Sequence, residues 1–558
     1  MVHLLSASAR GTRGLVLLSV VMLLAGATAG CGSDAPGPLP IAEGNPCEGP
    51  VTFAVGDTEG HADPLGSRSN EARAGVLAAD AVPPDPRGLN TYQAGDFVLA
   101  NEHIGLIIEA NRPSDHFVET GGMLVGLGRI RDGALVDVAD FGELIPSMGM
   151  FVLEPESVTV MRRGGRGQTA VVRVVGTMRE FDALPVLFEL FLRGDHTDWQ
   201  VAYDFSLAPG AEFAEVTVHA ANASNEVATV LSNALFAVQA NRMPLFAPGV
   251  GADTPSGTFP FLGFVDDVGT SYAWESPAGS IDTLLSVSNL QFYRAPGYSL
   301  EACAVHSEVI ARVHVGERGW DGLREAMART NGETLRPVTV SVRSSSGAPV
   351  VGARVHVSNT ADEYVTRGIT DASGDTVVHL PTGAHSAEAF VDAQGRSGAV
   401  AIAADASSVT LTFTAMGALT VGARVAGEDD VLPARVAIEP LDTPAPVTPV
   451  SWGEHLPPSG LQVLAFQTLT DGSYTLPPGE YRVTVSRGYE YELYTTDVQV
   501  EAGETTTVTA DLEHVVDTSD ELCGDFHIHT NRSFDAEDDA TTKVRAAAKT
   551  LQLEHLLD

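Results

Sequence analysis

The 558-residue chain contains few cysteines and few basic residues, and its one markedly apolar run lies within the first 30 residues. Four cysteines with no Cys-x-x-Cys pair exclude the common zinc and thiol-redox motifs. Lys and Arg number 33 against 72 Asp and Glu, a net charge of −39 that argues against nucleic acid as a partner. Hydrophobic residues make up 44% of the chain, which excludes disorder as its main state, and the length predicts three or four domains.

The amino-terminal residues have the pattern of an export signal. Arg10 and Arg13 precede an apolar run, Leu15 to Leu24, that is too short to span a bilayer comfortably. The small residues that follow end at Cys31. This pattern predicts a secretory signal peptide over residues 1–31.

The residues before Cys31 read Thr-Ala-Gly, which resembles the lipobox of bacterial lipoproteins. The resemblance implies that Cys31 is lipidated, although Thr28 stands where Leu is usual, so ordinary cleavage after a small residue is the alternative. Residues 32–48 are polar and rich in Gly and Pro, as expected of a flexible tether. We therefore expect a bacterial envelope lipoprotein, periplasmic or surface-facing, held at the outer or cytoplasmic membrane by its lipid.

Lipidation of Cys31 would leave three cysteines, which permit one disulfide and one remaining thiol. Cys47 with Cys303 is the preferred pair, because both would fall in one domain. The sequence alone leaves the pairing with Cys523 open.

Residues 49–332 predict a large β-sandwich. Short alternating or apolar runs recur between Gly, Pro, Asn and Asp residues, at 97–100, 105–109, 170–175, 186–192, 199–207 and 215–220. A short helix is expected from Trp320 to Arg329 at the end of this domain. The order of strands loosely resembles the supersandwich domains found with carbohydrate-active enzymes.

Two smaller units follow, at 335–415 and 416–515, and they resemble each other. Thr370-Asp371 and Thr470-Asp471 each precede a Gly, and Leu380-Pro381 and Leu476-Pro477 each lead to another Gly that ends a strand. Both units resemble carboxypeptidase-regulatory-like domains, which implies seven-stranded β-sandwiches of prealbumin type that space, support or bind. The Asp-Gly turns are interpreted as structural rather than as calcium sites.

The segment 522–558 carries the strongest chemical pattern. Asp525, His527 and His529 alternate with Phe526 and Ile528, so that on an extended strand the carboxylate and both imidazoles share one face. Burying such a set is costly unless the groups are paired or bound to metal. A helix is expected after Asp538 and a further strand at 553–557, which together form a βαβ unit.

The run Asp-Phe-His-Ile-His-Thr resembles the first motif of the PHP (polymerase and histidinol phosphatase) family, nearest in character to its secreted CehA/McbA-type metallohydrolases. The resemblance implies the start of an α/β barrel that binds divalent metal ions (Mn, Zn or Fe) and hydrolyses phosphoesters. It makes His527, His529 and Asp535 metal ligands, supported by Asp525, Thr530 and Ser533. The remaining ligands of the family have no counterpart in the chain, so this segment is at most part of a site.

Two functions from different classes follow from these observations. The first is an envelope-anchored, metal-dependent hydrolase of the PHP type that acts on phosphoesters through metal-activated water, incomplete in this chain. The alternative is a noncatalytic surface lipoprotein that binds glycan or protein through its β-sandwich domains. Neither substrate nor metal is specified by the sequence.

Overall fold

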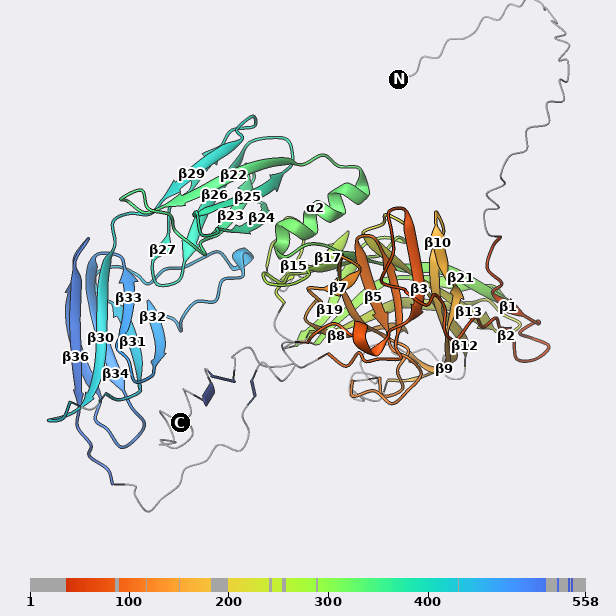
Figure 1. Cartoon of the computed structure of the whole chain (residues 1–558), viewed down its shortest axis with the longest axis horizontal. Coiled ribbons are helices and arrows are strands. Elements are labelled where there is room, and N and C mark those ends of the chain that lie inside the picture. Colours follow the sequence, from red (N-terminus) through yellow and green to blue (C-terminus); the bar gives the residue numbers. More distant parts are fainter. Residues whose placement is uncertain are drawn as a thin grey trace, which may run out of the picture. The chain divides into compact units, whose positions relative to one another are not determined.

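The computed structural model describes residues 37–85, 90–116, 118–149, 151–181, 199–239, 243–252, 257–287, 290–429, 431–517, 529–530, 540–541 and 543–544. The described chain is mainly β, with several antiparallel sheets and one helix, which confirms the mainly-β fold expected from the sequence (Figure 1). Of the predicted strands of the PHP-like segment, the structure describes only His529, which it does not assign to a strand.

The first and largest part is a two-layered β-sandwich. One layer has the strand order β9-β11-β12-β13-β21-β18-β17-β15. The other runs β10-β3-β4-β5-β6-β8-β14-β20-β19-β16, with β7 on β6, and a short β8–β9 pairing links the two layers. All these pairings are antiparallel. Inward-facing side chains of both layers form one buried core, including Leu106, Val174, Tyr203, Val218 and Val313.

The elements of this part are the following: β3 (Glu71–Val76), η1 (Ala79–Ala81), β4 (Phe97–Asn101), β5 (Ile104–Ile108), β6 (Leu124–Arg131), β7 (Ala134–Val136), β8 (Phe141–Met148), β9 (Phe151–Arg162), β10 (Gly164–Arg166), β11 (Ala170–Glu180), β12 (Gln200–Leu207), β13 (Phe213–Asn222), β14 (Ala228–Gln239), β15 (Leu245–Phe246), β16 (Thr258–Phe259), β17 (Phe261–Phe264), β18 (Tyr272–Glu275), β19 (Ile281–Val287), β20 (Leu290–Leu300) and β21 (Ala304–Val315). Five of the six predicted runs coincide with β4, β5, β11, β12 and β13. The sixth, 186–192, lies outside the described residues.

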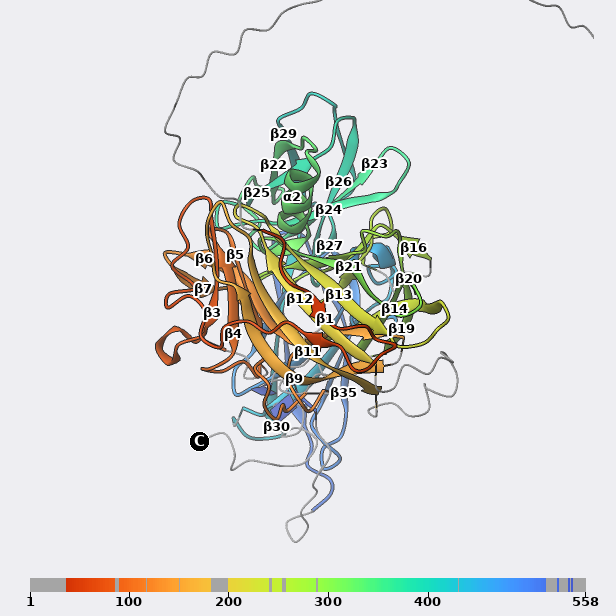
Figure 2. The ribbon, with the colours of Figure 1, turned by 90° about the vertical axis from the view of Figure 1, so that its right-hand side faces the viewer.

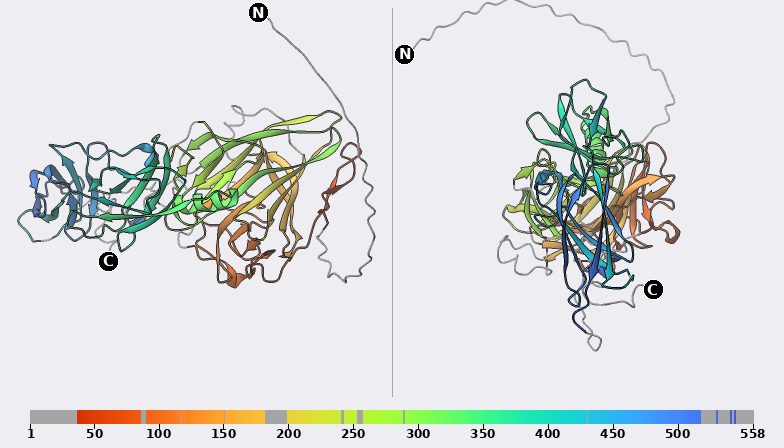
Figure 3. Two further views of the ribbon diagram at one scale, coloured as in Figure 1. Left: turned by 90° about the horizontal axis from the view of Figure 1, so that it is seen from above. Right: turned by 90° about the vertical axis from the view of Figure 1, so that its left-hand side faces the viewer.

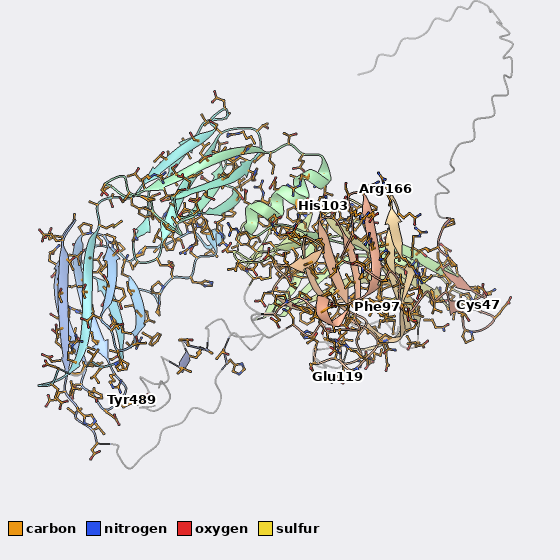
Figure 4. The ribbon with its side chains drawn as sticks, viewed as in Figure 1. Cys47, Phe97, His103, Glu119, Arg166 and Tyr489 are labelled. Carbon is orange, nitrogen blue, oxygen red and sulfur yellow. A yellow bond between two sulfur atoms is a disulfide. The ribbon has the colours of Figure 1, made fainter. Side chains whose placement is uncertain are left out.

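A hairpin of β1 (Ala42–Glu43) and β2 (Thr52–Phe53) lies against the outer face of β11, β12 and β13 (Figure 2). Val51 and Phe53 pack there with Ala202 in a small buried cluster. The loop of the hairpin carries Cys47, which is bonded to Cys303 with a Cα–Cα distance of 5.0 Å (Figure 4). The preferred pairing of the sequence analysis is thereby confirmed.

Helix α2 (Gly319–Asn331) follows β21 and is the one extended helix of the described residues (Figure 3). Its buried side chains Trp320, Leu323 and Met327 recur at helical spacing and give one apolar stripe. Gly332 ends the helix with φ of 68°, a left-handed conformation that glycine adopts without steric cost, and its N–H bonds back to the last turn. The predicted helix, 320–329, lies within α2.

Each smaller unit is a sandwich of two sheets with its own core. The first has the orders β25-β22-β29 and β24-β23-β26-β27, with β28 on β26; the second has β33-β30-β36 and β32-β31-β34-β35. The pairs β22–β29 and β30–β36 are parallel, in contrast to all others.

The elements of the two smaller units are β22 (Arg336–Arg343), β23 (Arg354–Asn359), β24 (Tyr364–Ile369), β25 (Asp375–Leu380), β26 (His385–Val391), β27 (Gly395–Arg396), β28 (Val400–Ile402), β29 (Ser408–Thr412), β30 (Gly417–Val425), β31 (Ala434–Pro440), η2 (Val450–Trp452), β32 (Val463–Gln467), β33 (Gly472–Leu476), β34 (Gly479–Ser486), β35 (Tyr494–Val500) and β36 (Thr505–Leu512).

In each smaller unit, an arginine near the end of the first strand pairs with an aspartate at or just before the start of a neighbouring strand. Arg343 at the end of β22 bonds to Asp375 at 2.7 Å, and Arg424 near the end of β30 bonds to Asp471 at 3.0 Å. In the first unit, Asp371 also accepts bonds from the backbone N–H groups of Ser373 and Asp375. These bonds fix the backbone of the turn at Asp371.

Candidate functional site: a polar cleft along helix α2

A cleft of about 1090 Å³ runs along one side of α2. Strand β6 and loops of the large sandwich, the helix, and strands β24 and β25 of the first small sandwich all contribute to its lining. The side chains that line it are mostly charged or polar, and they comprise Arg129, Arg131, Asp137, Asp267, Thr270, Glu317, Arg318, Asp321, Glu325, Arg367, Thr370, Asp371, Asp375, Thr376 and His379, with the apolar Val268, Ile369 and Val377 among them.

Asp321 fixes the helix to the first small sandwich at the base of the cleft. One carboxylate oxygen accepts bonds from the Thr366 hydroxyl and from the backbone N–H of His379, each at 2.9 Å. The other lies 2.7 Å from Nδ1 of His379, and the hydrogen bond to this carboxylate raises the pKa of His379. Trp320, the preceding residue, donates its indole N–H to the carbonyl of Val365 at 3.1 Å.

Ion pairs order the walls of the cleft. Glu317 contacts Arg129 at 3.2 Å and Arg131 at 2.7 Å, and Arg367 contacts Asp267 at 2.5 Å. The lining contains seven carboxylates against four guanidinium groups. The excess of negative charge disfavours an anionic ligand in this cleft.

A second polar cluster lies nearby, and two of its members, Arg354 and Glu454, line a cavity of about 320 Å³. Trp452, from the long connection between β31 and β32, stacks on the ring of His356 with ring centres 4.0 Å apart. The guanidinium of Arg396 lies 5.0 Å from the centre of the Trp452 ring. Glu454 bonds to Nε2 of His356 at 2.8 Å and also pairs with Arg354. Trp452 belongs to a buried cluster with Phe246 and Trp320, so this connection contacts both other sandwiches.

The structure describes two of the six residues that the sequence assigns to a metal site. His529 and Thr530 are half-buried, and both make interactions. His527, Asp535, Asp525 and Ser533 lie outside the described residues, as does the proposed lipidation residue Cys31. The nearby residues 540, 541, 543 and 544 are helical. Within the described part of the chain, no three His, Cys, Asp or Glu side chains are grouped as a metal site would require.

Sequence reasoning did not find the cleft. Asp321 has the ordinary appearance of an acidic residue in the first turn of a helix, where the helix dipole favours negative charge. His379 lies 58 residues further on in a strand, and no local pattern relates the two. Their contact becomes visible only once α2 packs on β24 and β25.

None of the helices in the described residues is both long and apolar enough to cross a membrane. The disulfide is of a kind that persists in oxidising compartments, in agreement with an exported protein.

Comparison with known proteins shows similarity in architecture only. No family model matches the chain, and no curated protein matches it in sequence. Among solved structures, the shaft pilin SpaA of Lactobacillus rhamnosus GG is similar at 11% identity and a TM-score of 0.21, over 33% of this chain and 99% of the pilin. The minor pilin GBS52 of Streptococcus agalactiae has 17% identity and a TM-score of 0.18 over 33% of this chain and 97% of its own. The Bacillus anthracis TIE protein has 12% identity and a TM-score of 0.15 over 60% of this chain and 59% of its own. Scores this low carry no conclusion about function.

Proposed function

We propose that the β-sandwich part of this protein binds a polysaccharide at the bacterial cell envelope through the cleft along α2. The observation that carries the proposal is the cleft itself: about 1090 Å³, open and lined by polar side chains that ion pairs hold in place. Ligand sites are concave and largely preformed, and polar groups with fixed positions give them specificity. The lipid anchor expected at Cys31 would place this cleft at the envelope.

The lining favours a glycan over a protein partner. The centres of protein interfaces are poor in charge and rich in aromatic side chains. The cleft has eleven carboxylate and guanidinium groups, and its described lining contains no Phe, Tyr or Trp. A neutral or cationic sugar chain suits the carboxylates, whereas a strongly anionic polymer would be repelled.

Filling the cleft tests the proposal. Val377 on β25 is 48% exposed and lines the cleft, whereas Val351 is 60% exposed in the same sandwich and does not. In co-sedimentation with purified peptidoglycan, chitin and cellulose, we expect the whole protein to bind at least one polymer, Val377→Trp to lose this binding, and Val351→Trp to keep it. Binding to none of the three, or equal binding by both variants, would contradict a glycan site in this cleft.

The second candidate function is a metal-dependent phosphoesterase at the carboxyl end. It is favoured by one observation, the alternation of Asp525, His527 and His529, which brings ligand groups to one face of a strand. A divalent ion would be held by His527, His529 and Asp535, and when bound it supplies a water of lowered pKa. This proposal concerns a separate segment and is compatible with a glycan-binding β part.

A further inference from the structure

Three polar side chains form a chain of contacts across the outer face of the large sandwich. Asp204 lies on β12, His219 on the adjacent β13, and Ser307 on β21 next to it (Figure 2). Their neighbours along the strands, such as Tyr203 and Val218, are buried in the core, so these three residues face the other way. Asp204 is 7% and His219 is 5% exposed, whereas Ser307 is exposed.

The imidazole of His219 lies within hydrogen-bonding distance of both the Asp204 carboxylate and the Ser307 hydroxyl. Oδ2 of Asp204 lies 3.0 Å from Nε2 of His219, and Nδ1 of His219 lies 2.7 Å from Oγ of Ser307. A carboxylate accepts hydrogen bonds, so Asp204 fixes the proton of His219 on Nε2. The lone pair of Nδ1 is then directed at the Ser307 hydroxyl, which donates to it.

Arg173 holds the carboxylate in place. Its Nε and NH2 groups donate to the two oxygens of Asp204 at 2.5 and 2.7 Å, and its remaining NH1 group donates to carbonyls of the amino-terminal segment, including Pro40 at 2.9 Å. Burial opposes ionisation of Asp204, but the hydrogen bonds from Arg173 and His219 outweigh it and hold the pKa of Asp204 below its usual value. Asp204 is therefore charged at neutral pH.

A cavity of about 610 Å³ lies further along β13, at Ala221. Trp199, Gln200 and Ala221 line it on the sandwich side, and Pro46 and Pro50 line it from the hairpin loop that the disulfide fixes. Ala221 is two residues from His219 on the same face of β13, a separation of about 7 Å. Ala221 pairs with Val305, two residues before Ser307 on β21, so an ester held at Ser307 enters the cavity if it extends about 7 Å along the strands.

We propose that Ser307, His219 and Asp204 form an ester-hydrolysing site, with the cavity at Trp199 receiving part of the substrate. Oγ of Ser307 bonds to the ester carbonyl carbon as its proton passes to Nδ1 of His219. The carbon–oxygen bond to the alcohol breaks, and the alcohol leaves with that proton. Water then attacks the acyl group, again losing a proton to His219, and releases the carboxylic acid while Ser307 regains its hydrogen. The reaction consumes one water and needs no cofactor.

Short-chain esters are the expected substrate class. The cavity mixes apolar surface from Trp199 and the prolines with polar side chains that include Thr177, Gln200 and Asn222, which suits a small acyl group that makes a few polar contacts. Aryl esters carry a good leaving group and place the smallest demand on the site, so 4-nitrophenyl butyrate is the probe of choice.

Labelling by a biotinylated fluorophosphonate tests this site in the whole protein. We expect the label on Ser307 in peptide mass spectra, and 4-nitrophenyl butyrate hydrolysis that Ser307→Ala lowers by roughly a hundredfold or more. Asp204→Asn should lower hydrolysis as well, because it removes the charge that orients His219. Ser299→Ala is the matched control, since Ser299 is also an exposed strand residue of this sandwich, and it should keep both label and turnover.

Folding is checked separately by the melting temperature, which Ser307→Ala should leave almost unchanged because Ser307 is exposed. A folded wild-type protein without label on Ser307, or equal ester hydrolysis by wild type and Ser307→Ala, would overturn the proposal. The chain of contacts would then serve only to satisfy the buried Asp204 and Arg173. Binding of polysaccharide at the α2 cleft is independent of either outcome.

Discussion

Nε2 of His356 lies 2.8 Å from Oε1 of Glu454, although 98 residues separate the two in the sequence. On its other side, Nδ1 of His356 lies 2.9 Å from the hydroxyl of Tyr364. The ring is stacked on Trp452, and Arg354 and Arg367 are the nearby cations. The contact ties the connection between β31 and β32 to strand β23 of the other small sandwich.

This contact predicts a loss of stability in acid. Burial lowers the pKa of His356 from 6.5 to about 4, so the folded protein resists a proton that the unfolded chain accepts. The stabilisation is therefore complete above pH 6.5 and is lost as the pH falls from 6.5 towards 4. Burial opposes ionisation of Glu454, but His356 and Arg354 outweigh it and lower the pKa of Glu454. Protonation of Glu454 therefore causes a further loss of stability at lower pH.

Melting temperatures between pH 7 and pH 4 measure this effect. We expect the wild type to lose stability through this window and His356→Gln, which cannot be protonated, to show a shallower dependence. His103→Gln, in the turn between β4 and β5, is the control and should follow the wild type (Figure 4). Parallel curves for wild type and His356→Gln would show that His356 does not carry the acid sensitivity.

The burial of Trp452 predicts that truncating its side chain lowers the stability of the protein considerably. Its side chain is buried in the cluster with Phe246 and Trp320, and Arg396 covers its ring. Removing a buried aromatic side chain leaves a cavity and costs about 3–5 kcal/mol. We expect Trp452→Ala to lower the free energy of unfolding by that amount in urea titrations, and Trp452→Phe to lower it by less. The control is Val450→Ala in the same turn, which should be nearly neutral because Val450 is 69% exposed. Similar losses of stability for Val450→Ala and Trp452→Ala would contradict the packing role of Trp452.

The sequence predicts the strands better than the contacts between them. Tyr481, Val483 and Val485 alternate with polar residues, and in β34 they are the buried face, because a strand that is covered on one side repeats every two residues. Observed strands extend a residue or two beyond such runs, since backbone pairing does not require an apolar side chain. The alternation involves only neighbouring residues, so it can be recognised from the sequence without knowing which strands pair.

The candidate sites depend on pairings that no local pattern contains. Asp204, His219 and Ser307 are strand neighbours across 103 residues of chain, from 204 to 307, and each alone is an ordinary polar residue on a strand. The metal motif at Asp525 to Thr530 is the opposite case, a strong local pattern of which the structure describes only His529 and Thr530. The Cys47–Cys303 bond is an intermediate case: the expected domain bounds favoured this pair, and the structure decides it.

The disulfide predicts a further measurable dependence. It joins residues 256 apart, so its removal frees a long loop in the unfolded chain and should cost about 2–5 kcal/mol. We expect Cys47→Ser with Cys303→Ser to lower the urea midpoint and Cys523→Ser to leave it unchanged. Non-reducing peptide maps should show the 47–303 link in the wild type, and a link from either cysteine to Cys523 would contradict the pairing.

The carboxyl-terminal motif predicts metal binding that can be measured without a substrate. If His527 and His529 hold a divalent ion, the whole protein purified in the presence of Mn²⁺ or Zn²⁺ should retain metal after dialysis, as measured by elemental analysis. The double change His527→Ala and His529→Ala should abolish this retention, because it removes two imidazole ligands of the metal. Asp525→Ala should weaken it by about 10- to 100-fold, the usual cost of removing a group that orients a ligand. His306→Ala, on β21 of the large sandwich, is the control, and equal metal content in all four proteins would refute the metal site.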